Sequence, residues 1–212
     1  DDVRCLHRSG LFGGSMFAPE PTPVRRFLVT GGAGFIGSHV VDTLIERGDA
    51  VIVLDNLDTG KIENIPNALA IDPMDVSKIT GGMIGFIEGS VLDTEILSHL
   101  VSSVDGIVHL AAIASVERCQ ENPSLDRAVN FDGLRNIMML SSSIESPCPV
   151  VFSSSAAVYG EPTKIPITED HSTTPISNYG VSKLDAERLI TDGDCIVPST
   201  AFRFFNVYGP RQ

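Results

Sequence analysis

Tyr179 and Lys183 carry the clearest potential for chemistry in this sequence, because they lie four residues apart in a segment with helical character. At that spacing two side chains share one face of a helix, which brings an ammonium within a few Å of a phenol. The positive charge stabilises the phenolate and lowers the pKa of the phenol from about 10 toward neutrality, so the tyrosine becomes a usable general base. A serine hydroxyl from the run at 153–155 can orient or relay a substrate proton. These residues predict a group built for proton transfer.

A second candidate site is the stretch Thr30-Gly31-Gly32-Ala33-Gly34-Phe35-Ile36-Gly37, which begins where an apolar run ends and a helical pattern of apolar residues starts. Gly31 permits a tight turn, Gly34 lets a pyrophosphate approach the backbone, and Gly37 lets the helix pack closely against the strand. Free N–H groups at the helix N-terminus then face the phosphates. The stretch is therefore predicted to bind a dinucleotide.

Asp55 supports that interpretation, because it ends the apolar run Val51–Leu54 and follows Gly37 by 18 residues. A carboxylate at this place can accept hydrogen bonds from both hydroxyls of an adenosine ribose, and it would repel a 2′-phosphate. NAD is thus favoured over NADP. The alternative is that Asp55 is only a turn residue at the end of a strand.

The elements that must position these residues alternate along the chain from residue 26. Strands are predicted at 27–29, 51–54, 83–87, 106–110, 150–152 and 200–205, and helices from 35 and over 93–100, 123–143 and 178–190, with a surface excursion of little regular structure at 59–82. Such alternation is typical of an α/β fold with a Rossmann-type, doubly wound parallel sheet. We therefore expect one cofactor-binding domain over residues 26–212, preceded by a flexible arm at 1–25. Ligands of these sheets bind at the carboxyl ends of the strands.

Composition narrows the classes of partner. The formal net charge of −12 over 212 residues argues against a nucleic-acid backbone as a ligand, and no apolar run is long enough to predict a membrane span. Residues 1–25 lack the pattern of a secretory signal. The cysteines are scattered without metal-ligand spacing, so we expect no metal site and reduced thiols in a cytoplasmic protein: Cys5, Cys119, Cys148 and Cys195.

From Phe27 to Gln212 the chain resembles the extended short-chain dehydrogenase/reductases, and within them the NAD-dependent nucleotide-sugar epimerase/dehydratase family, most of all the epimerases of the UDP-glucose 4-epimerase type. The motifs that carry the resemblance are the glycine-rich stretch at 30–37, Asp55-Asn56-Leu57, His109-Leu110-Ala111-Ala112, Asn130, the stretch Ser153 to Gly160, Tyr179 with Lys183, and Arg203-Phe204-Phe205-Asn206-Val207-Tyr208-Gly209-Pro210.

The resemblance implies a role for each matching residue. Tyr179 would be the general base toward a sugar hydroxyl, Lys183 would hold the nicotinamide ribose and tune Tyr179, and Ser155 would contact the reacting hydroxyl. Residues implied to bind NAD are Gly31, Gly34, Phe35, Ile36, Gly37, Asp55, Asn56, Val91, Leu110, Ala111, Ala112, Asn130, Ser153, Tyr179 and Lys183. Asn206 and Ser155 would contact the nucleotide-sugar substrate.

The serine stretch bears on the type of reaction. The sugar dehydratases that the chain resembles carry Thr-Asp-Glu at this point, whereas this chain has Ser-Ala-Ala at 155–157 and so keeps Tyr179 as the evident base. That favours epimerisation of a UDP-glucose/UDP-galactose type of sugar through a 4-keto intermediate. Three alternatives stay open: a dehydratase, a reductase, and an NAD-binding module without turnover.

Other features bear on the substrate side of the site. Ser90 stands where relatives usually have an aspartate that contacts adenine, and Ala114 stands where some galactose epimerases have a lysine. Family members continue for roughly another hundred residues, the length of a small domain, so most of the substrate domain is expected to be missing here. The resemblance also implies a homodimer through the helices at 123–143 and 178–190, although their apolar residues fit the core of the domain equally well.

Overall fold

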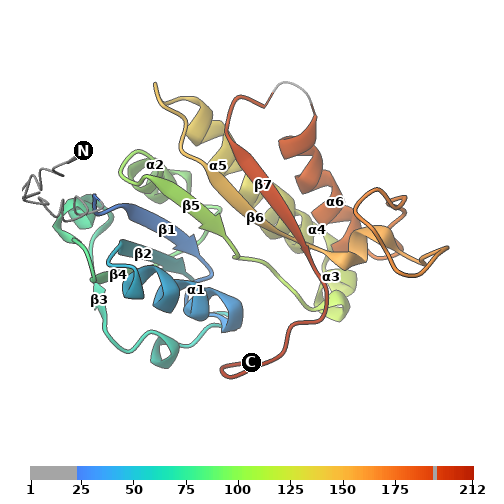
Figure 1. The fold of residues 1–212 in the computed structure, drawn as a ribbon, viewed down its shortest axis with the longest axis horizontal. Helices are drawn as coiled ribbons and strands as arrows, with labels where there is room; N and C mark the ends of the chain where they lie inside the picture. Colours follow the sequence, from blue (N-terminus) through green and yellow to red (C-terminus); the bar gives the residue numbers. More distant parts are fainter. Residues whose placement is uncertain (1–22, 193–194) are drawn as a thin grey trace, which may run out of the picture.

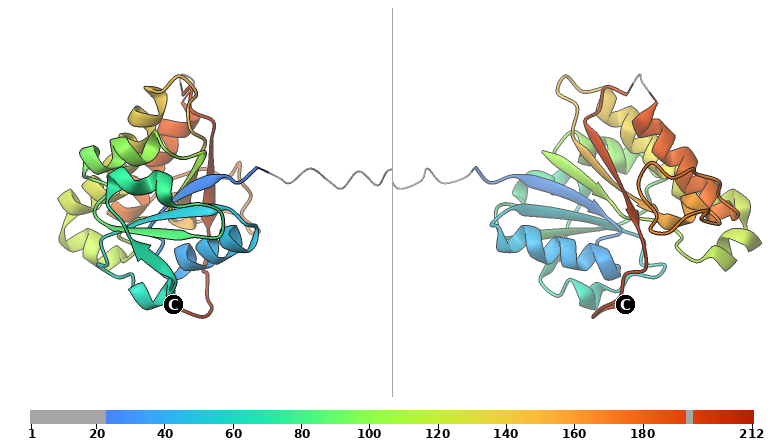
Figure 2. Two further views of the ribbon diagram at one scale, coloured as in Figure 1. Left: turned by 90° about the vertical axis from the view of Figure 1, so that its left-hand side faces the viewer. Right: turned by 45° about the vertical axis from the view of Figure 1, so that its right-hand side comes forward.

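The computed structural model describes residues 23–192 and 195–212 (Figure 1). Nearly all of the arm predicted at 1–25 lies outside these ranges. The described chain forms one sheet with helices on both sides, as the two turned views of Figure 2 show. The fold class predicted from the alternation of strands and helices is confirmed.

The sheet has seven strands in the described chain, all parallel, in the order β3-β4-β2-β1-β5-β6-β7. The strands are β1 (Arg26–Thr30), β2 (Ala50–Asp55), β3 (Ala68–Ala70), β4 (Ile84–Glu88), β5 (Gly106–His109), β6 (Val150–Ser155) and β7 (Ser199–Phe204). The order reverses between β1 and β5, because β2 lies on one side of β1 and β5 on the other. A crevice at such a switch point is where ligands of open α/β sheets bind.

Helices cover the two faces of the sheet unequally. They are α1 (Phe35–Glu46), α2 (Thr94–Val101), α3 (Val116–Glu121), α4 (Pro123–Arg127), α5 (Gly133–Ser142) and α6 (Asn178–Thr191). The core beneath α2, α5 and α6 includes Leu28, Ile52 and Phe152. On the opposite face α1 packs on Val29 and Val53. Neighbouring strand residues thus serve opposite faces, which explains why the central strands read as continuous apolar runs.

The surface excursion predicted at 59–82 needs a correction. It contains the short 3-10 helices Ile62–Asn64 and Pro73–Lys78, and between them strand β3, which pairs with β4 at the edge of the sheet. The burial of β3 is low, with Leu69 50% exposed. A three-residue strand with little apolar periodicity gives no signal of its own, because its hydrogen bonds come from β4 and not from its side chains.

The helix predicted over 123–143 is present as one helical run over 123–142, but it is not regular throughout. The structure has α4, then a π-helical turn at Ala128–Asp132, then α5, and a further helix α3 stands before them. Asn122 ends α3 and caps α4, since its side chain accepts a hydrogen bond from the Leu125 N–H (3.1 Å). Pro123 fits the first turn of α4, as predicted. The π turn inserts an extra residue per turn, and such turns occur frequently at functional sites.

The segment after β7 turns back and ends beneath α1 in the view of Figure 1. The Arg211 guanidinium contacts Asp42 (2.7 Å) and His39 Nδ1 (2.6 Å) and donates to the Asn64 carbonyl (3.1 Å). His39 Nε2 lies 3.0 Å from the Pro210 carbonyl oxygen. These contacts hold residues 205–212 beside the glycine-rich turn.

Candidate active site

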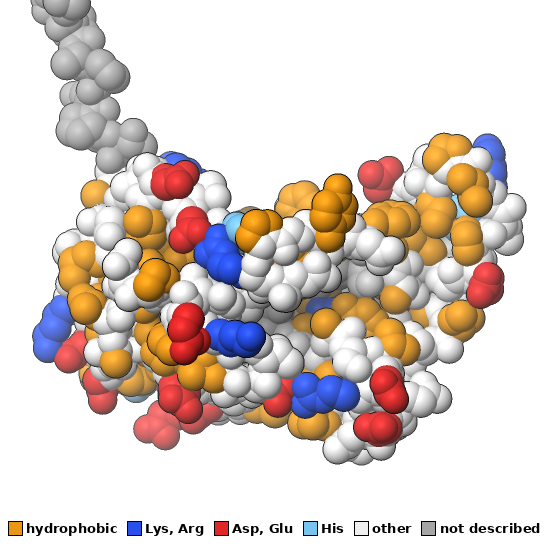
Figure 3. Space-filling view, turned by 90° about the horizontal axis from the view of Figure 1, so that it is seen from below, with side chains coloured by type: hydrophobic (Ala, Val, Ile, Leu, Met, Phe, Trp, Pro, Cys, Tyr) orange, Lys and Arg blue, Asp and Glu red, His pale blue; other side chains and the backbone are white. Residues whose placement is uncertain are grey.

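A cavity of about 980 Å³ lies at the carboxyl ends of the strands. Figure 3 views the molecule from this side and shows a hollow flanked by charged side chains. The cavity brings together nearly all of the predicted site residues: Gly31, Gly34, Phe35, Ile36, Gly37, Asp55, Asn56, Val91, Leu110, Ala111, Ala112, Ser153, Ser155, Tyr179, Lys183 and Asn206. Of the predicted residues, Asn130 is the exception.

The glycine-rich turn packs as the spacing of its glycines predicts. Gly31 has a φ of +72°, and a Cβ on it would lie 2.7 Å from the Ala111 nitrogen. A Cβ on Gly37 would lie 2.1 Å from the Gly31 carbonyl oxygen, a distance that no side chain tolerates. Gly34 differs, because the nearest protein atom to its Cβ would be 3.2 Å away and its φ of −76° suits any residue. Two glycines therefore serve the packing of strand, turn and helix, and Gly34 leaves backbone open to the cavity.

Asp55 organises the other side of the same turn. Its side chain is buried, and its carboxylate accepts hydrogen bonds from the Ala33 N–H (3.0 Å) and the Leu57 N–H (2.9 Å). Each carboxylate oxygen keeps acceptor capacity after one such bond. Asp55 thus stabilises the turn at the end of β2, as the alternative interpretation predicts, and it also offers free acceptor capacity at the edge of the cavity.

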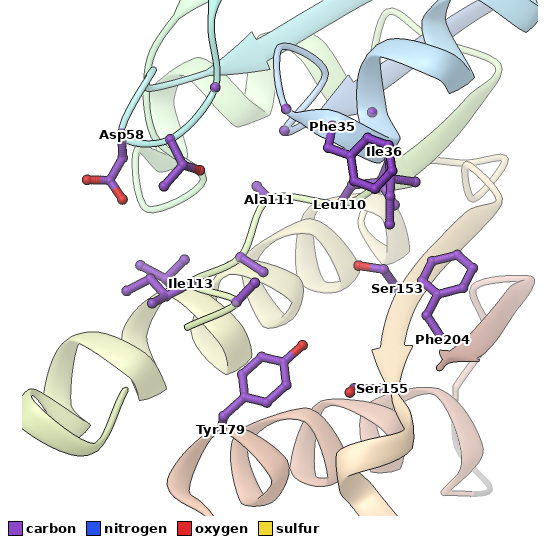
Figure 4. A pocket seen from close by; sticks show the side chains of 18 of the residues that line it. Phe35, Ile36, Asp58, Leu110, Ala111, Ile113, Ser153, Ser155, Tyr179 and Phe204 are labelled. Carbon is purple, nitrogen blue, oxygen red and sulfur yellow. The ribbon is translucent and has the colours of Figure 1, made fainter. Parts of the chain in front are cut away.

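Tyr179, Ser155 and Ser153 point into the cavity from α6 and β6 (Figure 4). Because side chains alternate along a strand, Ser154 faces the other way and donates to the Glu187 carboxylate. The Ser155 oxygen accepts from the Ala157 N–H (3.2 Å), which leaves its O–H free to donate. Ser153 donates to the His109 carbonyl (3.2 Å).

Lys183 is buried below Tyr179, on the same face of α6. Its Nζ donates to the Ser153 carbonyl (2.8 Å) and lies 5.8 Å from the centre of the Tyr179 ring. No other hydrogen bond of this ammonium is found among the described residues, so two N–H bonds remain for a ligand. Burial lowers the pKa of Lys183 to about 8.

The effect expected on the Tyr179 phenol is wrong for the protein alone. Burial raises the pKa of Tyr179 above its ordinary value, because an apolar environment disfavours the phenolate. The neighbouring Ser155 hydroxyl stabilises the phenolate and works against this shift, while the charge of Asp126 adds to it. The spacing in the helix correctly predicted the shared face, but desolvation outweighs the benefit expected from the ammonium.

Asn130 does not line the cavity, although it was expected to lie against the cofactor. It is fully buried in the π turn, behind the cavity wall. Its side chain accepts from the Ile113 N–H (3.0 Å) and donates to the Ile113 carbonyl (3.0 Å). Asn130 therefore fixes the backbone of Ile113, which lines the cavity, and does not line the cavity itself.

The turn after β5 is fixed from below by two buried side chains. Thr30 Oγ1 lies 2.7 Å from His109 Nδ1 and accepts from the Ala111 N–H (3.2 Å). Burial and the charge of Lys183 lower the pKa of His109 to about 3, so this ring is neutral at pH 7. The cavity wall at Leu110–Ala112 is thus held in place by the hydrogen bonds of Thr30 and by an uncharged His109.

Sequence reasoning missed an ion pair at the cavity. The Arg118 guanidinium contacts both carboxylate oxygens of Asp58 (2.8 and 3.2 Å), and both residues line the cavity. The pair joins the loop after β2 to α3, across 60 positions of sequence. The pKa of Asp58 is lowered by this guanidinium. No local signal could have found the pair, since α3 itself was not predicted.

The arrangement defines a class of protein. A parallel sheet with a switch point, a glycine turn at a helix N-terminus and an acidic residue after the second strand form a Rossmann-type dinucleotide site. The Tyr-x-x-x-Lys pair and Ser155 add proton-transfer chemistry to the same cavity. Among the described residues no group of His, Cys, Asp and Glu is suited to a metal ion, and no described helix is long and apolar enough to cross a membrane.

Comparisons with known proteins agree with this class. The model of the NAD dependent epimerase/dehydratase family matches residues 27–212. The chain is 38% identical over 189 residues to a putative UDP-glucose 4-epimerase of Methanocaldococcus jannaschii, covering 87% of this chain and 57% of that protein. The chain belongs to the NAD dependent epimerase/dehydratase family, whose cofactor is the one predicted.

Solved structures give the same result. A UDP-glucose 4-epimerase of Thermotoga maritima, solved with UDP-glucose, superposes with a TM-score of 0.75 at 37% identity, covering 88% of this chain and 57% of that one. The Thermus thermophilus UDP-glucose 4-epimerase in complex with NAD gives a TM-score of 0.76 at 36% identity, with coverage of 88% and 57%. The chain thus spans a little over half the length of the relatives that it matches.

Proposed function

We propose that the protein containing this chain is an NAD-dependent epimerase that acts on a nucleotide sugar of the UDP-glucose/UDP-galactose type through a 4-keto intermediate. The observation that carries the proposal is that Tyr179, Lys183 and Ser155 share one cavity with the glycine turn and Asp55. A dinucleotide and a hydroxyl-bearing substrate can then meet in a single space. The names of the relatives support the choice of substrate.

The residues present fit NAD. The open backbone at Gly34 and the N-terminus of α1 would hold the pyrophosphate, Asp55 and Asn56 the adenosine ribose, and the two unused N–H bonds of Lys183 the second ribose. When bound, NAD supplies a hydride acceptor that can give the hydride back, so the cycle needs no other oxidant.

The chain's own residues would handle the proton. Tyr179, in its phenolate form, would take the proton of the sugar hydroxyl as the ring carbon is oxidised, and would return it after the keto sugar has turned in the pocket. The free O–H of Ser155 would orient the reacting oxygen. Asn206, in the exposed segment just after β7, would contact the sugar nucleotide. Ser-Ala-Ala at 155–157 offers no second acid for the elimination of water, which favours epimerisation over dehydration.

We also propose that the protein is a homodimer in the cytoplasm. The apolar residues Ile137 and Met138 are buried in the core and cannot serve an interface. The same helices also carry Met139 and Val181, which are 63% and 43% exposed and supply apolar surface for a partner. Light scattering at micromolar concentration is expected to give twice the mass of the chain, and a monomer mass would reject the dimer.

Replacing Asp55 tests the cofactor site. Asp55→Ala removes the acceptor for the ribose and for the Ala33 and Leu57 N–H groups, so NAD affinity is expected to fall by about a hundredfold or more. Asp55→Asn removes the charge and keeps one acceptor oxygen, and is expected to narrow the preference for NAD over NADP. Calorimetric titration of the 212-residue chain with both nucleotides measures each effect.

The titration is followed by a UDP-sugar epimerisation assay, first on the same 212-residue sample and then on the intact protein. Interconversion of UDP-glucose and UDP-galactose would support the proposed epimerase activity. NAD binding without turnover by the intact protein would favour a binding module, and steady NADH consumption with a keto sugar would favour a reductase. Absence of NAD binding would remove the basis of the proposal.

A further inference from the structure

Asp126 is a buried carboxylate that the proposed reaction does not use. It lies in α4 with 1% of its surface exposed. Its Oδ1 accepts from Asn130 Nδ2 (2.6 Å) and its Oδ2 from Ser182 Oγ (2.8 Å). It forms no ion pair within the described residues. A buried charge held only by neutral groups is costly, so its retention calls for a compensating cation.

Lys183 is the matching buried cation. It is 1% exposed and also lacks an ion-pair partner among the described residues. Ser182, which donates to Asp126, directly precedes Lys183 in α6. The hydrogen bond therefore fixes the turn of helix that carries the lysine, and it places two buried opposite charges on neighbouring elements.

We propose that Asp126 is a positioning residue of the active site, which holds the Lys183 turn through Ser182 and supplies the negative charge that balances the Lys183 ammonium. This inference rests on the proposed function, in which a protonated Lys183 donates hydrogen bonds to the second ribose of NAD and acts on Tyr179. Through Asn130, the same carboxylate is also tied to the Ile113 backbone at the cavity wall.

The other titratable groups around Lys183 supply no unpaired negative charge, so Asp126 is the group that balances the Lys183 ammonium. His109 is neutral, because burial lowers its pKa to about 3. Cys119 is a neutral thiol, because burial and Asp126 raise its pKa to about 12. Tyr179 stays a phenol in the protein alone, since burial raises its pKa. Glu187, one turn further along α6, is paired with Arg203 (2.7 Å).

The charge of Asp126 acts in the same direction on both members of the catalytic pair. It raises the pKa of Lys183, against the larger lowering by burial, and it also raises the pKa of Tyr179. Removing the charge is therefore expected to move the titrations of both residues to lower pH. A purely structural residue would change stability without moving either titration.

The test uses ¹³C-lysine-labelled protein and follows each Cε signal by NMR as the pH is raised. The sequence holds four lysines, and Lys61, Lys78 and Lys164 are exposed and serve as internal references. Lys183 is expected to titrate near pH 8 in the parent chain. In Asp126→Asn its midpoint is expected to fall by about one pH unit, the size of a charge interaction across several Å of protein. Asparagine can still bond Asn130 and Ser182, because the serine hydroxyl can turn to accept.

Asp185→Asn is the matched control. Asp185 lies two residues from Lys183 on α6, is partly exposed and pairs with Arg127 (2.6 Å), so its loss is expected to leave the Lys183 midpoint in place. An unmoved midpoint in a folded Asp126→Asn chain would overturn the proposal. If that variant does not fold, Asp126→Ser is titrated in its place, and failure of both to fold would make Asp126 a structural residue and equally overturn it. The titration needs no nucleotide, so its outcome is independent of whether the chain binds NAD.

Discussion

Gly37→Ala is expected to abolish NAD binding and to destabilise the whole domain. A Cβ at this position would lie 2.1 Å from the Gly31 carbonyl oxygen and 2.8 Å from Gly32 Cα, and all of these atoms belong to backbone. The overlap can be relieved only by moving α1 away from β1. Overpacking of this kind costs about 2–3 kcal/mol of unfolding free energy. Urea unfolding of the 212-residue chain, with calorimetric titration of NAD, measures both losses.

Gly34→Ala is the informative partner of that variant. Its backbone is in a conformation open to alanine, and the nearest contact of the new methyl is 3.2 Å, so stability is expected to change by less than about 1 kcal/mol. Gly34 lines the cavity, so the added methyl is expected to hinder the approach of a pyrophosphate to the backbone and to lower NAD affinity by about tenfold or more. Equal stability losses in the two variants would show that the glycines share one structural role and would contradict the division drawn between them.

The sequence predicted the central part of the fold because two patterns coincide there. Apolar runs such as 51–54 are buried on both faces, and the glycine spacing at 31, 34 and 37 is meaningful only between a strand and a helix. The edge of the sheet was missed for the opposite reason. Strand β3 is half exposed and is held by backbone hydrogen bonds to β4, which no side-chain pattern records.

The candidate site was predictable where motif residues line the cavity directly. Tyr179, Ser155 and Asp55 reach it because each stands at the end of a strand or on the inner face of a helix. Asn130 could not be placed, because it is fully buried in a π turn, behind the residues that line the cavity. Its contact with Ile113 spans 17 residues and depends on a turn that periodicity does not reveal.

The electrostatics of the site were the least predictable part. Spacing alone places an ammonium near a phenol, but the balance of charge depends on burial and on groups from other elements. Asp126 comes from α4, and its charge acts on both Tyr179 and Lys183 through space, while His109 on β5 is kept neutral by burial and by the charge of Lys183. Desolvation raises the phenol pKa and lowers the lysine pKa, so the protein alone holds both residues protonated at pH 7.

Tyr179→Phe is expected to lower the epimerisation rate of the intact protein by about a thousandfold, within the range that loss of a positioned general base costs. The ring stays in place over Lys183, so only the proton acceptor is removed. NAD affinity is expected to stay within about threefold of the parent, because the glycine turn, Asp55 and the Lys183 ammonium are unchanged. Parallel measurement of kcat and of NAD binding separates the two effects.

Tyr159→Phe provides the control for the loss of a phenol. The Tyr159 hydroxyl accepts from Arg203 (3.1 Å) and the residue is buried beside β7. Its removal is expected to cost about 1 kcal/mol of stability and less than tenfold in rate. If both variants lost activity equally, the phenol of Tyr179 would have no special part in proton transfer. Retention of most activity in Tyr179→Phe would instead move the general base to another group in the cavity, and the free hydroxyl of Ser155 would be the first to replace.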